Sequence, residues 1–410
     1  MKRYTIALSE TGMNALVRAN QKIVAQRFDR EFAVNLVKQV LEPLDQCYFR
    51  SEFIGFDPFP ERNNPERPLI FASNHAGMAF PWDGIIFTSQ LLKRNHFDFS
   101  RAVRALTAPM LSQTTLMNPF LVADFWKRVG SVDATSLNVE TMMHDNDSNV
   151  LIYPEGVPGI GKGFDKRYQL QRFATSFVRV SLKYRTDIIP FATVNGEYIN
   201  PFAYHSAGIN KIANKIGIPF LPLGLMTLLI PLQPWLFYFG FPAKLTYVMG
   251  KRIKPYEMID KPLDKITETE VQELTERIRR QMQEELQQAV KAYGRRPYAA
   301  KEFFAVCRKN VKRFPYFLPF FWPSLFAEVE RRSLENDNGP WKISLLSGIQ
   351  AFLKRPLSFA FFLPILGWLP ILWRGYTSKP PHDVDLFRIA EGEAPPLHEC
   401  GVAGKQPVQL

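Results

Sequence analysis

The sequence predicts an α/β protein, with an open, largely parallel sheet flanked by helices, N-terminal helices before it and a helical extension after it. Short apolar strands alternate with helical stretches between residues 67 and 260, which is typical of a parallel sheet. Polar residues follow two of these strands, at the edge where such sheets bind ligands. The 410 residues are 46% hydrophobic, which is enough to form a large core.

The N-terminal segment, residues 1–66, is predicted to be helical. Apolar residues recur at helical spacing over 14–44, and we expect Pro43 to close this stretch. A polar, proline-rich loop follows over 57–68. The α/β domain then covers residues 67–260. Its expected strands cover 68–72, 102–106, 149–153 and 187–194, and its expected helices cover 83–93 and 173–184.

Residues 261–295 carry the strongest helix pattern in the chain. Thr267 and Glu270 form a capping box, apolar residues follow at helical spacing, and Gly294 is placed to end the helix. Because these apolar residues form a single stripe, we expect this amphipathic helix to pack on the α/β domain.

Two uncharged apolar stretches suggest contact with lipid. Residues 216–243 are long enough to span a bilayer, but prolines interrupt any single helix. We therefore expect a membrane-facing surface or re-entrant segment, with a buried core segment as the alternative. Residues 357–373 lie within a basic and aromatic extension, 296–376, for which we expect monotopic membrane association. The Pro- and Gly-rich tail, 377–410, is predicted to be disordered.

Charge and cysteine content point to a partner and a compartment. The net charge of +12 indicates an anionic partner, and the 13% of aromatic residues favour a membrane surface over nucleic acid. The three cysteines form no CxxC pair, and the N-terminus lacks the apolar stretch of a secretory signal. We therefore expect no metal site and a location at the cytoplasmic face of the inner membrane.

The first candidate site is the segment NHAGMAFPWD, residues 74–83. It places His75 on a loop after a strand, and Asp83 at the start of the next helix. A carboxylate beside a histidine fixes the imidazole tautomer and stabilises the imidazolium that forms when the base takes a proton. Alternatively, Asp83 serves only the helix N-terminus, through the helix dipole.

The second candidate site is the segment YPEGVPGIGKG, residues 153–163, which follows another strand. Gly156 to Lys162 matches the spacing of a nucleotide-binding P-loop. However, Gly163 replaces the Ser or Thr that holds magnesium, and Pro158 lacks an amide proton for the phosphate cradle. The sequence therefore disfavours a nucleotide site here.

Taken together, these segments resemble the glycerolipid (lysophospholipid) acyltransferase superfamily, in particular a bacterial branch similar to 1-acylglycerol-3-phosphate acyltransferases. The resemblance covers residues 48–295. Four motifs of that family appear in order, namely His75 with Asp83, a Gly-containing block at 130–132, Tyr153-Pro154-Glu155-Gly156, and an Ile-Pro block at 188–191.

The chain departs from the family pattern in two places. Seven residues separate His75 from Asp83 where the family has four, so a longer loop must fold the carboxylate back onto the imidazole. The arginines that family members use to bind an acceptor phosphate are absent from the second and third motifs. Candidate substitutes are Lys162, Lys166, Arg167 and Arg172. The alternative, a solvated basic loop, is expected to account for at least two of these four.

The resemblance implies direct acyl transfer to a glycerolipid or lysophospholipid hydroxyl, with His75 as the base and Asp83 holding it. Acyl-CoA or acyl-carrier protein is the implied co-substrate, without a metal or other cofactor. Membrane lipids are the implied partners, and nucleic acid is not. The implied substrate-binding residues are Asn74, Gly77, Tyr153, Pro154, Glu155, Gly156, Lys162 and Arg167, with backbone amides near Gly77 or Gly156 as oxyanion donors.

Two other functions stay open on the sequence alone. The long spacing allows a non-catalytic membrane-binding protein of the same fold, in which His75 and Asp83 lie too far apart to hydrogen-bond. The charge and the near P-loop allow a nucleic-acid or nucleotide binder, which predicts salt-sensitive DNA binding or stabilisation by ATP.

Overall fold

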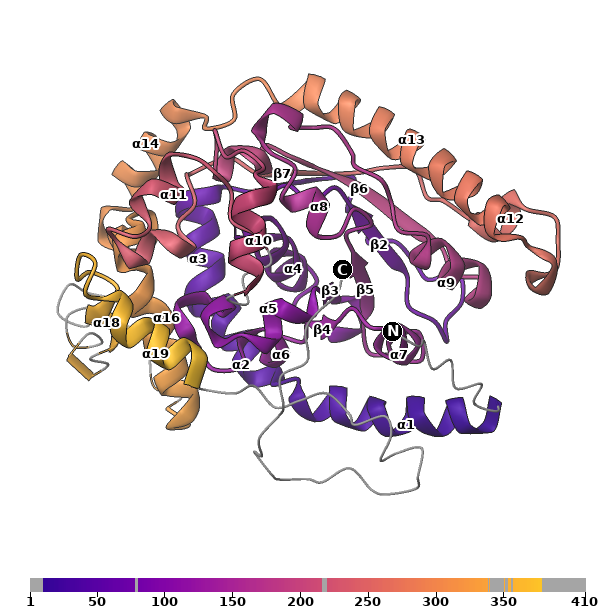
Figure 1. Cartoon of the computed structure of the whole chain (residues 1–410), viewed down its shortest axis with the longest axis horizontal. Helices are drawn as coiled ribbons and strands as arrows, with labels where there is room; N and C mark the ends of the chain where they lie inside the picture. The colour runs from indigo at the N-terminus through magenta and orange to yellow at the C-terminus, as the bar shows by residue number, and fades with distance from the viewer. Residues whose placement is uncertain are drawn as a thin grey trace.

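The fold is taken from a computed structural model that describes residues 10–377, apart from 78–79, 216–219, 338, 340–349, 351–352 and 355–356. A seven-stranded sheet lies at its centre, in the order β1-β7-β6-β2-β5-β3-β4. Neighbouring strands are parallel, except for the antiparallel pair β6 and β7. Helices cover the sheet (Figure 1), so the predicted fold class is confirmed.

All four expected strands are present. They are β2 (Ile70–Ser73), β3 (Val103–Thr107), β5 (Asn149–Ile152) and β6 (Ile188–Val194). Apolar periodicity does not reveal three others, because they are short or lie beside polar segments: β1 (Glu52–Ile54), β4 (Val132–Asp133) and β7 (Thr246–Met249). The central strand β2 is buried along its whole length, and its carboxyl end leads directly into the first candidate site.

The N-terminal segment differs from the single stretch predicted to close at Pro43. Asp29 accepts a hydrogen bond from the backbone N–H of Phe32 (2.9 Å) and caps a new helix. Pro43 does not end the helical path, because the π-helical turn before it runs directly into α3, in whose first turn Pro43 lies. The observed order is α1 (Glu10–Arg27), α2 (Arg30–Leu36), the π-helical turn η1 (Val37–Leu41), α3 (Glu42–Leu44) and a second π-helical turn η2 (Asp45–Phe49).

The two faces of the sheet are covered by different helices. Phe71 of β2 packs with α4 (Trp82–Arg94), whereas its neighbours Ile70 and Ala72 pack with α9 (Ser176–Tyr184) and α13 (Glu268–Tyr293). Helix α13 is the predicted amphipathic helix, and its capping box is present. The remaining helices of this part are α5 (Pro109–Gln113), α6 (Phe125–Arg128), α7 (Ser136–Met142), α8 (Val157–Ile160) and α12 (Pro255–Met258).

The apolar stretch at 216–243 is broken, as its prolines predict. It follows α10 (Ala207–Lys215) and contains α11 (Leu225–Leu229) and the 3-10 turn η8 (Pro234–Tyr238). Leu225 and Leu228 are exposed, whereas Tyr238 and Ala243 are buried in the core. Among its described residues, the stretch therefore combines an exposed apolar part with a part that belongs to the core.

The C-terminal extension is partly built into the core. Its helices are α14 (Ala300–Lys309), α15 (Phe314–Phe317), α16 (Trp322–Leu334), α18 (Leu357–Ala360) and α19 (Trp368–Thr377). Trp322 and Phe326 of α16 are fully buried and pack against Trp82 of α4. Among the described residues, no helix is both long and apolar enough to cross a bilayer. The tail predicted to be disordered lies outside the described residues from 378 onward.

Candidate active site

His75 and Asp83 meet at the carboxyl end of β2. His75 lies just past the strand, and Asp83 is the second residue of α4. The imidazole Nδ1 lies 2.9 Å from Asp83 Oδ2, and the same oxygen accepts the backbone N–H of Ala76 at 2.9 Å. The Asp83 side chain is fully buried, while 14% of the His75 side chain stays exposed. The longer loop therefore does fold the carboxylate back onto the imidazole.

This contact defines the chemistry that the imidazole can perform. Because an ionised Asp83 only accepts hydrogen bonds, Nδ1 must carry the proton, and the lone pair stays on Nε2. Burial raises the pKa of the Asp83 carboxyl, but the charge of His75 and the hydrogen bonds from His75 and the Ala76 N–H outweigh this and lower the pKa overall. His75 is thus held in the tautomer of a general base.

The loop between the two residues leaves little space. A Cβ at Gly77 would lie 2.7 Å from the carbonyl oxygen of Phe80 and 3.1 Å from Asp83 Oδ1, so a side chain there would clash with the backbone and crowd the carboxylate. Behind it, the Tyr247 hydroxyl donates to the backbone carbonyl of Asp83 (2.7 Å). Gly77 therefore leaves room for the Asp83 carboxylate, and Tyr247 holds the Asp83 backbone in place.

Tyr153 forms one wall against the imidazole. Its ring stacks on that of His75, with the centroids 4.0 Å apart and the planes 14° from parallel. Its hydroxyl is buried and has no hydrogen-bond partner among the described residues. Burial, with a smaller effect from the charge of Asp83, raises the pKa of Tyr153 well above its ordinary value, so the phenol stays neutral.

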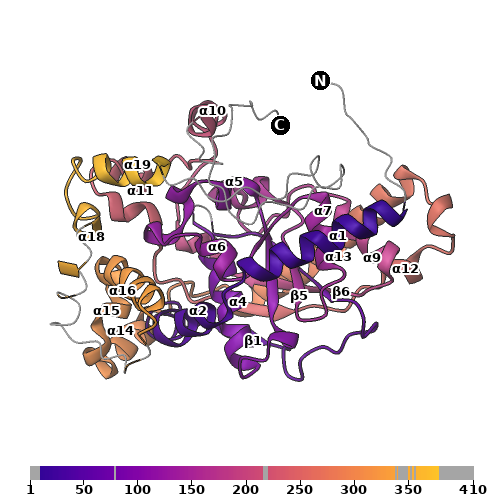
Figure 2. The same cartoon turned by 90° about the horizontal axis from the view of Figure 1, so that it is seen from below.

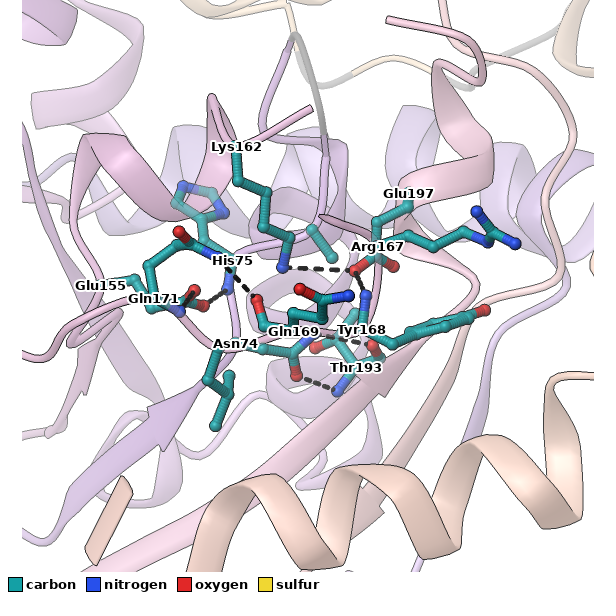
Figure 3. A network of polar contacts seen from close by, with 12 residues as sticks. Asn74, His75, Glu155, Lys162, Arg167, Tyr168, Gln169, Gln171, Thr193 and Glu197 are labelled. Carbon is teal, nitrogen blue, oxygen red and sulfur yellow. Dashed lines mark hydrogen bonds and ion pairs between the residues drawn. The ribbon is translucent and has the colours of Figure 1, made fainter. Parts of the chain in front are cut away.

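Glu155 ties the two candidate segments together. Its carboxylate accepts the backbone N–H of His75 (3.2 Å) through Oε1 and that of Gln171 (2.6 Å) through Oε2, as Figure 3 shows. The carbonyl of Pro154 accepts the backbone N–H of Ala174 (2.9 Å). The loop after β5 is thereby fixed both to the loop after β2 and to the segment before α9.

Gly156 and Asn74 have structural contacts. Gly156 has a positive φ of 60°, and its N–H donates to the carbonyl of Tyr153 (2.9 Å), so this amide is not free to bind an oxyanion. The Asn74 side chain donates to the carbonyl of Thr193 (2.9 Å) and accepts the Thr193 N–H (2.8 Å), which joins β2 to β6.

The sequence suggests phosphate-binding roles for Lys162 and Arg167, but both side chains make other contacts in the structure. Lys162 Nζ lies 3.4 Å from Glu197 Oε1, with both side chains 0% exposed. Glu197 also accepts the backbone N–H of Tyr168 (3.0 Å), and Figure 3 shows this network. Arg167 is exposed, with its guanidinium over the ring of Phe164. Lys162 is therefore enclosed by protein and is not available to a substrate phosphate in this structure.

A large cavity of about 1240 Å³ opens at His75. It exceeds the roughly 300–1,000 Å³ of typical small-molecule pockets. Of the four basic residues that could replace the missing arginines, Arg172 lines the cavity, whereas Lys162, Lys166 and Arg167 do not. Most of its lining side chains are apolar, and those from α2, η1, α4 and β3 include Leu36, Val37, Ile85, Leu92, Val103 and Leu106.

Three residues that contribute to the site escaped the sequence analysis. Gln171 contacts Glu155 through its backbone N–H, a contact that leaves no trace in a side-chain pattern. Glu197 and Tyr247 are polar groups that follow or lie within apolar strand segments, and this is the signal that could have identified them. In the part of the chain that the structure describes, no group of three His, Cys, Asp or Glu side chains could hold a metal ion.

Comparisons with known proteins give relatives but no family. No protein-family model matches the chain. It is 25% identical over 260 residues to an uncharacterised protein of Mycobacterium tuberculosis, covering 63% of this chain and 67% of that protein. An uncharacterised protein of Mycobacterium leprae is 26% identical over 227 residues, which are 55% of this chain and 57% of that protein.

One solved structure is similar at a low level. It is the crystal structure of PlsC, a 1-acyl-sn-glycerophosphate acyltransferase from Thermotoga maritima, with a TM-score of 0.33 and 12% sequence identity. The match covers 67% of this chain and 89% of that one.

Proposed function

We propose that this protein is an acyltransferase that moves a fatty acyl group from a thioester to a hydroxyl group of a glycerolipid or lysophospholipid. The observation that carries the proposal is the 2.9 Å contact between His75 and the buried Asp83, at the edge of a large, mainly apolar cavity. The alternative of a non-catalytic protein predicted that these two side chains are too far apart to hydrogen-bond, and the contact removes that argument.

In the proposed reaction, His75 Nε2 takes the proton of the acceptor hydroxyl while its oxygen attacks the thioester carbonyl carbon. The resulting tetrahedral intermediate re-forms the carbonyl and expels the thiolate, which takes the proton back from the imidazolium. Asp83 stabilises the imidazolium in between, since its ionised carboxyl lies against Nδ1. The products are an ester and a free thiol, and no covalent intermediate with the enzyme is required.

The cavity supports an apolar substrate with an anionic group. Its apolar walls suit a fatty chain, which gains roughly 0.8 kcal/mol for each methylene that it buries. Arg172 lies on the wall and offers a planar, bidentate partner for phosphate or carboxylate. The donor in this proposal is acyl-CoA or acyl-carrier protein, and the site of action is the cytoplasmic face of the membrane.

A panel of acceptors tests the proposal. The purified chain is incubated with a radiolabelled long-chain acyl-CoA, or the acyl-carrier protein thioester, and with lysophospholipids, monoacylglycerols and diacylglycerols in turn. We expect one acceptor class to yield a labelled lipid, with thiol released in equal amount. Thiol release without a labelled lipid would indicate a thioesterase, and no release with any acceptor or donor would contradict the proposal.

A further inference from the structure

Two apolar stretches that are far apart in the sequence meet on one side of the protein. The first is the described part of 216–243, and the second is 357–373. The backbone N–H of Ile365 donates to the carbonyl of Leu232 (3.1 Å), and the indole N–H of Trp368 donates to the carbonyl of Ile230 (3.0 Å). The rings of Trp368 and Phe237 are in edge-to-face contact. Helices α11 and α19 therefore lie next to each other, as Figure 2 shows.

Both of these neighbouring stretches expose large apolar side chains. The exposed fraction is 66% for Leu225 on the first stretch and 71% for Trp373 on the second. Single exposed apolar residues are normal, but a contiguous group of them marks a surface that binds an apolar partner. The docking face, as we define it, consists of Leu225, Leu228, Leu232, Leu366, Leu369 and Trp373.

The chain around the docking face lacks negative charge. Residues 198–256 and 338–382 contain no Asp or Glu, although the chain holds 39 acidic residues in 410. Lys211 and Lys215 are exposed on α10, which occupies the same side as α11 and α19 in Figure 2. Exposed apolar side chains and exposed lysines, in chain segments that contain no Asp or Glu, match a bilayer that contains anionic lipid.

The first of the two stretches also leads to the candidate active site. Phe220 lines the cavity that opens at His75, and its ring lies 3.4 Å from where a Cβ of Gly161 would be. Next to it, the backbone N–H of Leu221 donates to Asn210 of α10 (2.9 Å). One apolar segment thus runs from the wall of the cavity to the docking face.

We propose that the docking face binds the surface of a bilayer containing anionic lipid, and that it holds the cavity beside that surface. The two stretches act as one unit, since hydrogen bonds join α19 to the end of α11. Neither stretch needs to cross the bilayer, because insertion of the exposed leucines and Trp373 to the depth of the interface buries them.

Vesicle flotation with the full chain tests this proposal without requiring any enzymatic activity. The vesicles contain phosphatidylcholine and phosphatidylglycerol in a ratio of about three to one. We expect the double variant Leu369→Glu/Trp373→Glu to lower the bound fraction at least about tenfold, since each carboxylate must be desolvated at the interface. Leu263→Glu is the matched control, because Leu263 is also exposed but lies outside the docking face, and its binding should equal that of the wild type.

A second flotation experiment tests whether the lysines on α10 contribute to binding of anionic lipid. Lys211→Glu/Lys215→Glu should weaken binding to the anionic vesicles about tenfold and leave the weaker binding to pure phosphatidylcholine nearly unchanged. Equal flotation of the wild type and the Leu369→Glu/Trp373→Glu variant would overturn the proposal. It would also be overturned if the wild type formed dimers that this variant abolishes while neither bound vesicles, because the docking face would then bind a second copy of the chain. Circular dichroism checks that each variant is folded.

Discussion

Two pairs of ionisable side chains lie on neighbouring loops at the same edge of the sheet, yet their surroundings differ. In the first, Asp83 is buried while 14% of the His75 side chain remains exposed toward the cavity. In the second, Lys162 and Glu197 are both 0% exposed. Hydrogen bonds and charge lower the pKa of Asp83, whereas burial, only partly offset by Lys162, raises the pKa of Glu197. The His75 imidazole therefore stays accessible from the cavity, whereas Lys162 and Glu197 are both enclosed by protein.

The Asp83→Asn variant should show the largest effect of the comparison. Its amide can donate to Nδ1 and so favour the wrong imidazole tautomer, and it cannot stabilise an imidazolium. We expect the acyl-transfer rate to fall by about 10²–10⁴-fold with little change in KM, as measured by steady-state kinetics. A rate within threefold of the wild type would show that Asp83 serves only the helix.

The same variant gives a pH test. The lowered pKa means that the Asp83 carboxylate contributes stability above its ordinary value of 3.8, and that this contribution disappears as the pH falls through the lower folded value. The difference in unfolding free energy between the wild type and Asp83→Asn should therefore shrink as the pH falls below 3.8. A difference that grows on acidification would contradict the assignment.

Lys162→Met should act on stability instead. It leaves the carboxyl of Glu197 buried without a cation, which we expect to lower the unfolding free energy by about 3–5 kcal/mol in urea titrations. The double variant Lys162→Met/Glu197→Gln should recover most of that loss. Lys166→Met, on the exposed part of the same loop, is the control and should change stability by less than about 0.5 kcal/mol. A stable Lys162→Met protein that fails to bind its acceptor would restore the phosphate-binding role.

This contrast also shows how far the sequence predicts the site. His75 and Asp83 are close in the chain, so their pattern and the start of α4 could be read locally, as could the capping box of α13. The partner of Lys162 could not be predicted in this way, because the assembly of distant strands brings Glu197 next to Lys162. Likewise, the hydrogen bond that joins Trp368 to Ile230 spans 138 residues, so no local pattern predicts that the two apolar stretches meet.

The path of the chain near Pro43 could not be predicted for a different reason. A proline in a helical pattern normally marks its end. Here two π-helical turns flank a short α-helix that accommodates Pro43, and tertiary packing of Leu36, Val40 and Leu44 in the core stabilises that irregular path. Packing therefore outweighs the local preference.

Arg172→Gln should have a smaller effect, restricted to anionic acceptors. Removing the guanidinium from the cavity wall should raise KM for a lysophospholipid or lysophosphatidic acid by about tenfold, since hydrogen bonds to charged groups contribute about 1.5–3 kcal/mol. KM for a neutral monoacylglycerol should not change. Arg167→Gln is the matched control, because Arg167 is exposed and does not line the cavity. If both variants raise KM equally, Arg172 has no special role.

Tyr153→Phe should have the smallest effect. The ring that stacks on His75 is kept, and a buried hydroxyl without a partner among the described residues is removed. We expect an unchanged rate and a gain of up to about 1 kcal/mol in unfolding free energy. A large loss of rate would show that the hydroxyl donates to the reacting group.

The proposed role of His75 as general base is tested most directly by the initial rate of acyl transfer by His75→Ala, with the best acceptor from the panel. His96→Asn serves as control, because His96 is exposed and its positive φ suits asparagine. With both variants folded by circular dichroism, we expect a rate at least about 100-fold lower for His75→Ala and a wild-type rate for His96→Asn. Transfer by His75→Ala within threefold of the wild type would contradict the proposed role.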